Sequence, residues 1–136
     1  MNAVAPTNEL QEMDWRRLIE TIHQGQCILV LGPDASIENV GGIEQTLSTG
    51  LAQLLNEKLD GDQQVTDQDD LAHVAQAYLR QKNDRFELEL EVGDYYKSHD
   101  SDTNDVNLNL AGLPFDLCIT TAHDQYLKNA FDKKNK

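Results

Sequence analysis

Two short apolar runs constrain the fold of this chain more than any other feature of its sequence. Residues 27–31 read Cys-Ile-Leu-Val-Leu, and residues 117–121 read Leu-Cys-Ile-Thr-Thr. Continuous runs of this length, bounded by turn residues, are typical of strands that are covered on both faces in a parallel sheet. Because helical patterns separate the two runs, we expect two parallel strands joined by a right-handed crossover that contains helices.

Helical periodicity marks most of the remaining chain. The spacing of apolar residues predicts helices over about residues 10–22, 47–59, 69–79 and 124–131. Asn8, Asp69 and Asp124 are the expected N-caps, and Gly25 is the expected end of the first helix.

Three further segments lack a clear helical period. Residues 86–92 alternate with period two, as a half-exposed strand would, but their glutamates and the tyrosines that follow favour a helix. The stretch through Gly41 and Gly42 is interpreted as a glycine-rich connection, and residues 98–109 as a polar loop.

The length of 136 residues is short for a doubly wound nucleotide-binding domain with both halves present. We therefore expect an α/β fold, a three-layer Rossmann-like parallel sheet with flanking helices, of which this chain holds an incomplete half. The expected organisation is a flexible lead-in over residues 1–8, the α/β domain over residues 9–132 and a polar tail over residues 133–136.

Charge and hydropathy exclude several classes of partner. The stretch from Glu57 to Asp105 holds 14 acidic and five basic residues, and the whole chain has a net charge of −13. Such a surface repels phosphate backbones and anionic lipids, so we expect neither a nucleic-acid nor a membrane partner. The longest apolar run is far below the ~20 residues that span a bilayer, and the amino terminus lacks a secretory pattern, which predicts a cytoplasmic protein.

Cysteines and histidines give no metal-binding pattern. Cys27 and Cys118 lie inside the apolar runs, so we expect buried, reduced thiols with a structural role. The four histidines are scattered at positions 23, 73, 99 and 123, so no metal cofactor is expected.

The first candidate site is Gly32-Pro33-Asp34-Ala35-Ser36, directly after the first strand, where a doubly wound fold places its ligand loop. Gly32 would let backbone N–H groups approach a pyrophosphate. Pro33 removes one donor, however, and Asp34 adds a carboxylate beside the ligand's own negative charge. The segment is equally compatible with a tight turn that binds nothing.

The second candidate site is Thr120-Thr121-Ala122-His123-Asp124, at the carboxyl end of the second strand. His123 and Asp124 are candidate catalytic residues, because histidine titrates near neutral pH and a carboxylate can orient it. Adjacent residues usually point apart, however. The alternative is that Asp124 caps the last helix while His123 is an exposed loop residue.

Taken together, these motifs resemble those of prokaryotic sirtuin-like domains, which occur in multidomain conflict and signalling proteins. The resemblance runs from about Trp15 to Phe131 and is carried by Trp15-Arg-Arg-Leu-Ile-Glu, Gly25, residues 28–36 and residues 113–127. That family has Gly-Ala-Gly-x-Ser in the first loop, matched here at Gly32 and Ser36. It has Thr-Thr-Asn-x-Asp in the second, matched here at Thr120, Thr121 and Asp124. The resemblance implies an NAD or ADP-ribose site over Gly32, Pro33, Asp34, Ala35, Ser36, Thr120, Thr121, Ala122 and Asp124.

The departures from the family fall on functional positions. Asp34 replaces its second glycine, and Ala122 replaces the asparagine that helps to hold and hydrolyse NAD. Family members also carry a histidine base and a further nucleotide-binding loop after the second motif, which these 136 residues do not include. The resemblance therefore implies that the fold is kept and that NAD cleavage is lost. Any dinucleotide binding should be weak, with a dissociation constant above about 0.1 mM.

Three functions remain open from the sequence. The first is a degenerate sirtuin-like module for binding or assembly, as the amino-terminal part of a larger prokaryotic signalling or antiviral defence protein. The second is an NAD hydrolase or NAD-dependent deacylase whose other catalytic residues lie outside this chain, and the third is an interaction domain without a nucleotide. Because two apolar strands rarely form a stable sheet alone, we expect self-association or further domains of a larger protein to complete it.

Overall fold

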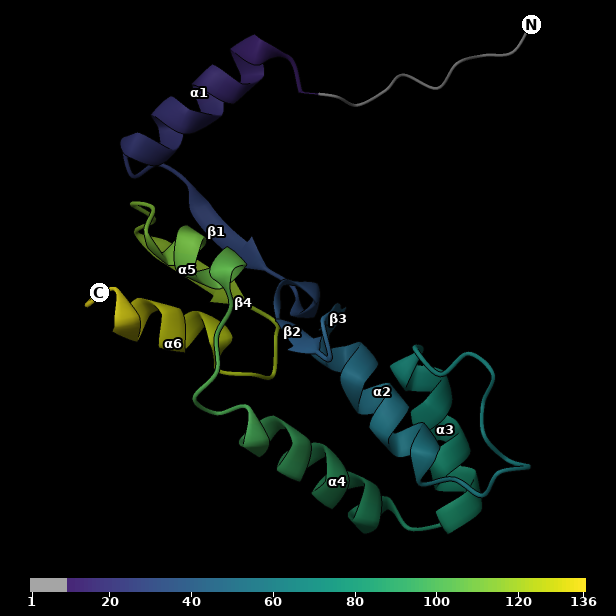
Figure 1. Cartoon of the computed structure of the whole chain (residues 1–136). Coiled ribbons are helices and arrows are strands. Elements are labelled where there is room, and N and C mark those ends of the chain that lie inside the picture. The colour runs from purple at the N-terminus through teal and green to yellow at the C-terminus, as the bar shows by residue number, and fades with distance from the viewer. Residues whose placement is uncertain (1–9) are drawn as a thin grey trace, which may run out of the picture.

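The computed structural model describes residues 10–136 and shows an α/β arrangement of helices around a small parallel sheet (Figure 1). The elements are α1 (Glu12–His23), β1 (Ile28–Leu31), the short 3₁₀ turn η1 (Pro33–Ala35), β2 (Ile37–Val40), β3 (Ile43–Thr46), α2 (Leu47–Glu57), α3 (Leu71–Lys82), α4 (Arg85–Ser98), α5 (Asp105–Ala111), β4 (Leu117–Thr120) and α6 (Tyr126–Lys133). The expected lead-in and the Asn8 cap lie outside the described residues.

The two apolar runs form a parallel pair of strands, as the sequence predicts. β1 pairs with β4 in a register that sets Ile28 beside Leu117 and Val30 beside Ile119. Because side chains alternate along a strand, these four residues share one face of the pair. Leu29 and Leu31 of β1, with their partners Cys118 and Thr120 of β4, occupy the other face.

The expectation that both faces of this sheet are covered is wrong. The side of Ile28 and Val30 is open, with those residues 58% and 64% exposed, whereas Leu29 on the opposite side is buried. The helices α5 and α6 lie beside the pair, but α1 projects away from it (Figure 1). Among the described residues, no third strand joins β1 and β4.

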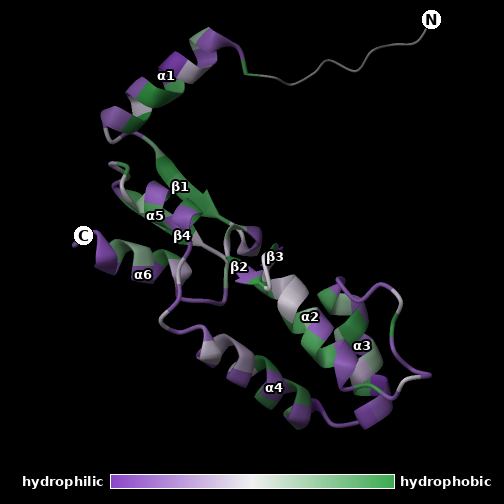
Figure 2. Ribbon diagram, viewed as in Figure 1, coloured by the Kyte–Doolittle hydropathy of each residue, from purple (hydrophilic) through white to green (hydrophobic). Residues whose placement is uncertain are grey.

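The first helix has no fully buried residue. α1 begins at Glu12, where Gln11 is the N-cap, and every one of its residues is at least partly exposed. Gly25 follows the helix with φ of +67°, a conformation that favours glycine, so the predicted stop is confirmed. Hydropathy along the ribbon shows apolar positions alternating with polar ones in α1 and an apolar β1 (Figure 2).

The glycine-rich connection is a β-hairpin, which corrects the sequence interpretation. β2 and β3 pair antiparallel around Gly41 and Gly42, whose φ angles are +61° and +87°. Positive φ at both central residues is the geometry of a tight hairpin turn, and Gly-Gly supplies it without strain. The side-chain oxygen of Asn39 accepts the N–H of Gly42 and closes the turn.

The hydrophobic core lies where α2, α3 and α4 meet. Its buried residues are Leu47, Leu51, Ala52, Leu55, Leu59, Val74, Tyr78, Tyr95 and Tyr126. The helical prediction for residues 86–92 is confirmed by α4. The expected cap of α3 was one residue early, because Asp70 accepts the N–H of His73, while Asp69 accepts a hydrogen bond from the side chain of Gln53.

The expected polar loop over residues 98–109 contains most of helix α5. Asn104 caps this helix by accepting the N–H of Asn107. The segment looks polar because Asp105 and two asparagines interrupt the apolar spacing, but Asn107 is buried in the structure. The side-chain amide of Asn107 is therefore shielded from solvent.

Candidate functional site

A pocket of about 730 Å³ opens at the carboxyl ends of β1 and β4, and both sequence-predicted segments line it. Gly32, Ala35 and Ser36 come from the first segment, and Thr120, Ala122, His123 and Asp124 from the second. Pro33, Asp34 and Thr121 are not among its lining residues. The other lining residues are Leu31, Asn107, Phe115, Asp116, Cys118, Gln125, Leu127, Lys128, Phe131, Asp132 and Lys136.

The first segment folds as a 3₁₀ turn. The N–H of Ala35 donates to the carbonyl of Gly32 at 3.3 Å, and the N–H of Ser36 donates to that of Pro33 at 3.1 Å. These two backbone donors are therefore used inside the turn. A helix N-terminus that cradles a phosphate would instead leave such donors open.

Gly32 lies in an ordinary extended conformation, with φ of −87°. A Cβ added at this position would meet no atom within 4 Å. Neither backbone strain nor packing against the protein therefore requires a glycine here. Gly32 is one of the residues that line the pocket.

Two asparagines hold this turn, and sequence reasoning missed both. The side-chain amides of Asn104 and Asn107 donate to the carbonyl of Ala35 at 2.8 and 3.0 Å. Asn107 also donates to the side-chain oxygen of Asn104 at 2.8 Å. Asparagine is a favoured N-cap residue, so Asn104 could have located the start of α5, although not the contact with Ala35.

The second segment continues the strand pairing into a loop. The N–H of Thr121 donates to the carbonyl of Leu31 at 3.0 Å, and the hydroxyl of Thr120 accepts the N–H of Ala122 at 3.1 Å. Ala122 is half-buried and lines the pocket. Its methyl group cannot donate or accept a hydrogen bond there.

The His123-Asp124 pair has the geometry of the capping alternative. Asp124 accepts the N–H of Tyr126 at 2.9 Å, although the N-cap position itself is Gln125, one residue later than expected. His123 is exposed, and its ring lies edge-on to that of Tyr96 with 6.2 Å between centroids. The Asp124 carboxylate is thus hydrogen-bonded to the backbone at the start of α6.

The rest of the lining combines apolar walls with charges of both signs. Phe115, Leu127 and Phe131 supply apolar surface, and the ammonium of Lys128 pairs with Asp132 at 2.8 Å. Cys118 is half-buried rather than fully buried as expected, and burial raises the pKa of its thiol. Cys27 is likewise half-buried and free.

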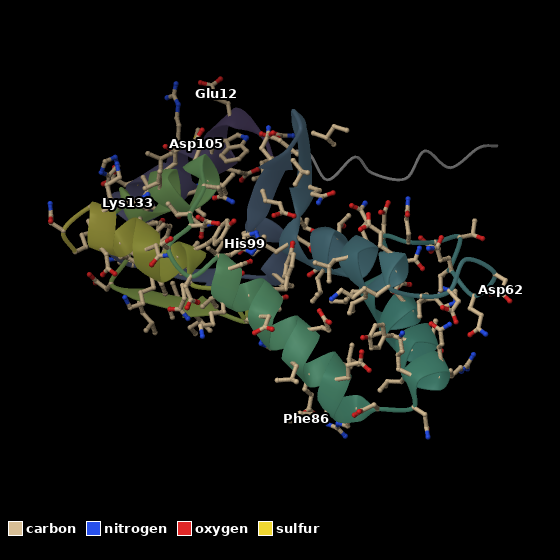
Figure 3. The ribbon with its side chains drawn as sticks, turned by 60° about the horizontal axis from the view of Figure 1, so that its bottom comes forward. Glu12, Asp62, Phe86, His99, Asp105 and Lys133 are labelled. Atoms are coloured by element: carbon tan, nitrogen blue, oxygen red, sulfur yellow. The ribbon has the colours of Figure 1, made fainter. Side chains whose placement is uncertain are left out.

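A second pocket, of about 550 Å³, lies between the β2–β3 hairpin and the loop before α5. Glu38 and His99 line it, and His99 marks the end of α4 opposite to Phe86 (Figure 3). Nε2 of His99 lies 2.7 Å from Glu38, and its Nδ1 lies 2.9 Å from the carbonyl of Tyr95. A ring protonated on both nitrogens would donate to both neighbours, and Nδ1 also lies 3.1 Å from the Ser98 hydroxyl.

Hydrogen bonds within this cluster outweigh the effect of burial on the pKa values of His99 and Glu38. Burial alone would lower the pKa of His99, but the Tyr95 carbonyl and the Glu38 carboxylate raise it above the ordinary value. Burial would likewise raise the pKa of Glu38, yet hydrogen bonds from Gln45, His99 and Tyr95 lower it. When His99 is protonated, the two side chains form an ion pair that ties the hairpin to the end of α4.

Residues 10–136 contain neither a metal-binding cluster nor a membrane-spanning helix. Across residues 10–136, no group of three or more His, Cys, Asp or Glu side chains is placed to hold a metal ion. None of the helices described there combines the length and apolar character needed to cross a membrane. Comparison with protein-family models, with curated proteins and with solved structures finds no match for this chain.

Proposed function

We propose that this chain is a non-catalytic, sirtuin-like binding module, an incomplete Rossmann-like domain whose pocket takes a nucleotide-type ligand such as NAD or ADP-ribose weakly. The main support is the meeting of two distant segments, Gly32–Ser36 and Thr120–Asp124, in one pocket at the carboxyl ends of parallel strands. In open α/β sheets, ligands bind at that edge.

The lining of the pocket supports the class of ligand. Phe115 and Phe131 offer apolar surface to a flat ring, while Thr120 and Lys128 offer polar groups. Sites for small cofactors combine mostly apolar walls with a few polar groups in this way. The volume of about 730 Å³ lies within the usual range for such sites.

The same residues support weak binding without cleavage. The N–H groups of Ala35 and Ser36 are used inside the turn, so they do not reach a pyrophosphate. Ala122 cannot orient a water molecule. Asp124 accepts a backbone N–H, which competes with its use in acid–base chemistry.

The internal hydrogen bonds of the turn also favour a second candidate function, an interaction domain that binds no nucleotide. The two candidates differ in whether anything enters the pocket. Titration calorimetry with NAD and with ADP-ribose separates them. The proposal predicts a dissociation constant above about 0.1 mM, whereas absence of heat at millimolar ligand would favour the interaction domain.

The Gly32→Ala variant adds a methyl group at a residue that lines the pocket, where a Cβ meets no other atom of the protein. The variant should fold normally and lower the affinity for ADP-ribose about tenfold or more, because the methyl group would keep the ligand away from the backbone at this residue. Gly61→Ala is the matched control, since a Cβ there also meets nothing but Gly61 does not line the pocket. Equal affinities in both variants would mean that the ligand does not bind at Gly32.

Chromatography for released nicotinamide tests the catalytic alternative. The proposal predicts no release from NAD by the purified chain. Release that disappears in Asp124→Ala would establish an NAD hydrolase instead.

Asp34→Gly, which removes an exposed carboxylate near the pocket, should tighten binding modestly because it removes a long-range charge repulsion.

A further inference from the structure

Two apolar surfaces are left uncovered by residues 10–136. The bare sheet face consists of Ile28, Val30, Leu117 and Ile119, which the register of β1 and β4 sets side by side. All four are between 47% and 64% exposed. Side chains of this kind on a parallel sheet are normally covered by helices.

The second surface is the α1 stripe, formed by Trp15, Leu18, Ile19 and Ile22. Their spacing of three, four and seven residues places them on one side of the helix. Trp15 and Ile19 are 51% and 53% exposed. The stripe runs over eight residues, about 12 Å of helix, and four-residue strands are about 13 Å long, so the two surfaces match in length.

The connection between α1 and β1 keeps the two surfaces apart within one chain. The N–H groups of Gln24, Gly25 and Gln26 donate to carbonyls in the last turns of α1. A Cβ at Gly25 would approach the carboxylate of Asp116 to 3.0 Å, so this turn is packed as well as hydrogen-bonded. Folding α1 back onto its own sheet would require this turn to be rebuilt.

We propose that a second copy of this chain supplies the cover: the α1 stripe of each chain packs on the bare sheet face of the other. Such an exchange is self-complementary and closes with two-fold symmetry, so it ends at a dimer. It builds the missing helix layer of the α/β fold from residues that the chain already carries.

The area of these surfaces fits a stable dimer. A fully buried aliphatic side chain removes roughly 100 Å² from water and a tryptophan roughly 200 Å², so the half-exposed residues of two chains offer about 850 Å² of apolar surface. With the usual apolar share of an interface, the total is about 1,400 Å², within the standard range for specific complexes.

Charge also permits this contact. Residues 57–105 hold most of the excess acid, whereas the ionised side chains of α1 nearly cancel, with Glu12 paired to Arg16 at 2.7 Å. Two chains of charge −13 still repel each other at long range. The dimer should therefore strengthen as salt screens that repulsion.

The contact is independent of the pocket. Leu31, Cys118 and Thr120 line the pocket from the opposite face of the same two strands. A variant of the bare sheet face should therefore leave ligand affinity unchanged. Loss of the dimer and loss of ligand binding can be scored separately.

Sedimentation and tryptophan fluorescence together test the proposal, because Trp15 is the single tryptophan of the sequence. Between about 1 μM and 1 mM, we expect the mass to rise from 15.3 kDa toward twice that value. The emission of Trp15 should shift to shorter wavelength over the same concentrations. A chain that stays monomeric throughout would overturn the proposal, as would Trp15 buried at the lowest concentration, which would place α1 on its own sheet.

Two charged variants test the pairing of the surfaces. Val30→Lys and Leu18→Lys should each remain monomeric, while the control Ile43→Lys, at a residue 70% exposed on the hairpin, should dimerise like the parent chain. A mixture of Val30→Lys with Leu18→Lys retains one intact contact per pair and should regain part of the association. Failure of the mixture to associate, or dimers of Val30→Lys alone, would rule out reciprocal packing.

Discussion

The α2–α4 region and the α1–β1–β4 region contain apolar side chains in similar patterns but bury them very differently. Leu51, Leu55 and Val74 are at most 1% exposed in the helical region. In the other region Val30 is 64% exposed, and every residue of α1 is at least partly exposed. An amphipathic pattern therefore shows that a segment can be buried, not that this chain supplies the partner.

The difference follows from connectivity. α2, α3 and α4 are consecutive, so their apolar faces meet through local contacts at modest loop-closure cost. A parallel pair needs a layer on each face, and the described residues provide α5 and α6 beside one.

The largest effect is expected for Leu55→Ala in the helical core. Leu55 is fully buried, so truncation removes apolar contacts and leaves a cavity, at a cost of about 2–5 kcal/mol in the free energy of unfolding. Urea denaturation at low protein concentration measures it. The control Leu90→Ala, 51% exposed on α4, should change stability by less than about 1 kcal/mol. Equal losses would mean that the core does not lie where α2, α3 and α4 meet.

A smaller loss is expected for Gly50→Ala inside α2. A Cβ at this position would overlap the Glu38 carboxylate and the Tyr95 hydroxyl, so we expect a cost of about 1–3 kcal/mol despite the better helix propensity of alanine. Gly93→Ala in α4 meets nothing and should instead stabilise by roughly 0.5–1 kcal/mol. Stabilisation by both variants would show that Glu38 and Tyr95 do not approach α2 closely.

The Glu38–His99 ion pair should make stability depend on pH. The raised pKa of His99 contributes stability that is complete below pH 6.5 and is lost as pH rises through the folded-state value. The lowered pKa of Glu38 contributes stability that is complete above pH 4.5 and is lost as pH falls through its folded-state value.

The contribution of the pair is therefore greatest between pH 4.5 and 6.5. Denaturation at several pH values should show this maximum in the parent chain and a flatter profile in Glu38→Gln. A His123→Gln control, at an exposed residue, should keep the maximum. An unchanged pH profile in Glu38→Gln would show that the ion pair does not cause the stability maximum.

The smallest effect is expected for Val30→Ala, measured where the chain is monomeric. Val30 is mostly exposed, so truncation should change the free energy of unfolding by no more than about 0.5–1 kcal/mol. At high concentration the same variant should lose more stability, because it weakens the proposed dimer. A loss of several kcal/mol in the monomer would mean that the bare sheet face is covered within one chain.

Local patterns in the sequence predicted most of the helices and strands. The apolar runs predicted β1, β4 and their parallel pairing, and the 3.6-residue period predicted α1, α2, α3 and α6. The hairpin at Gly41 and Gly42 was missed although Gly-Gly between two short strands is a recognised turn signal. Of the two candidate segments, Gly32, Ser36 and Asp124 do line a common pocket, whereas Asp34 does not.

By itself, the sequence determined where most of the helices and the two parallel strands form, because propensity, capping and periodicity act over a few residues. Only the tertiary structure decided what those elements bury. It placed the Asn107 amide on the turn at Ala35, joined His99 to Glu38 and left the side of Val30 open. These outcomes depend on contacts between residues far apart in the chain, and the period of a short segment carries no information about which distant surface it will meet.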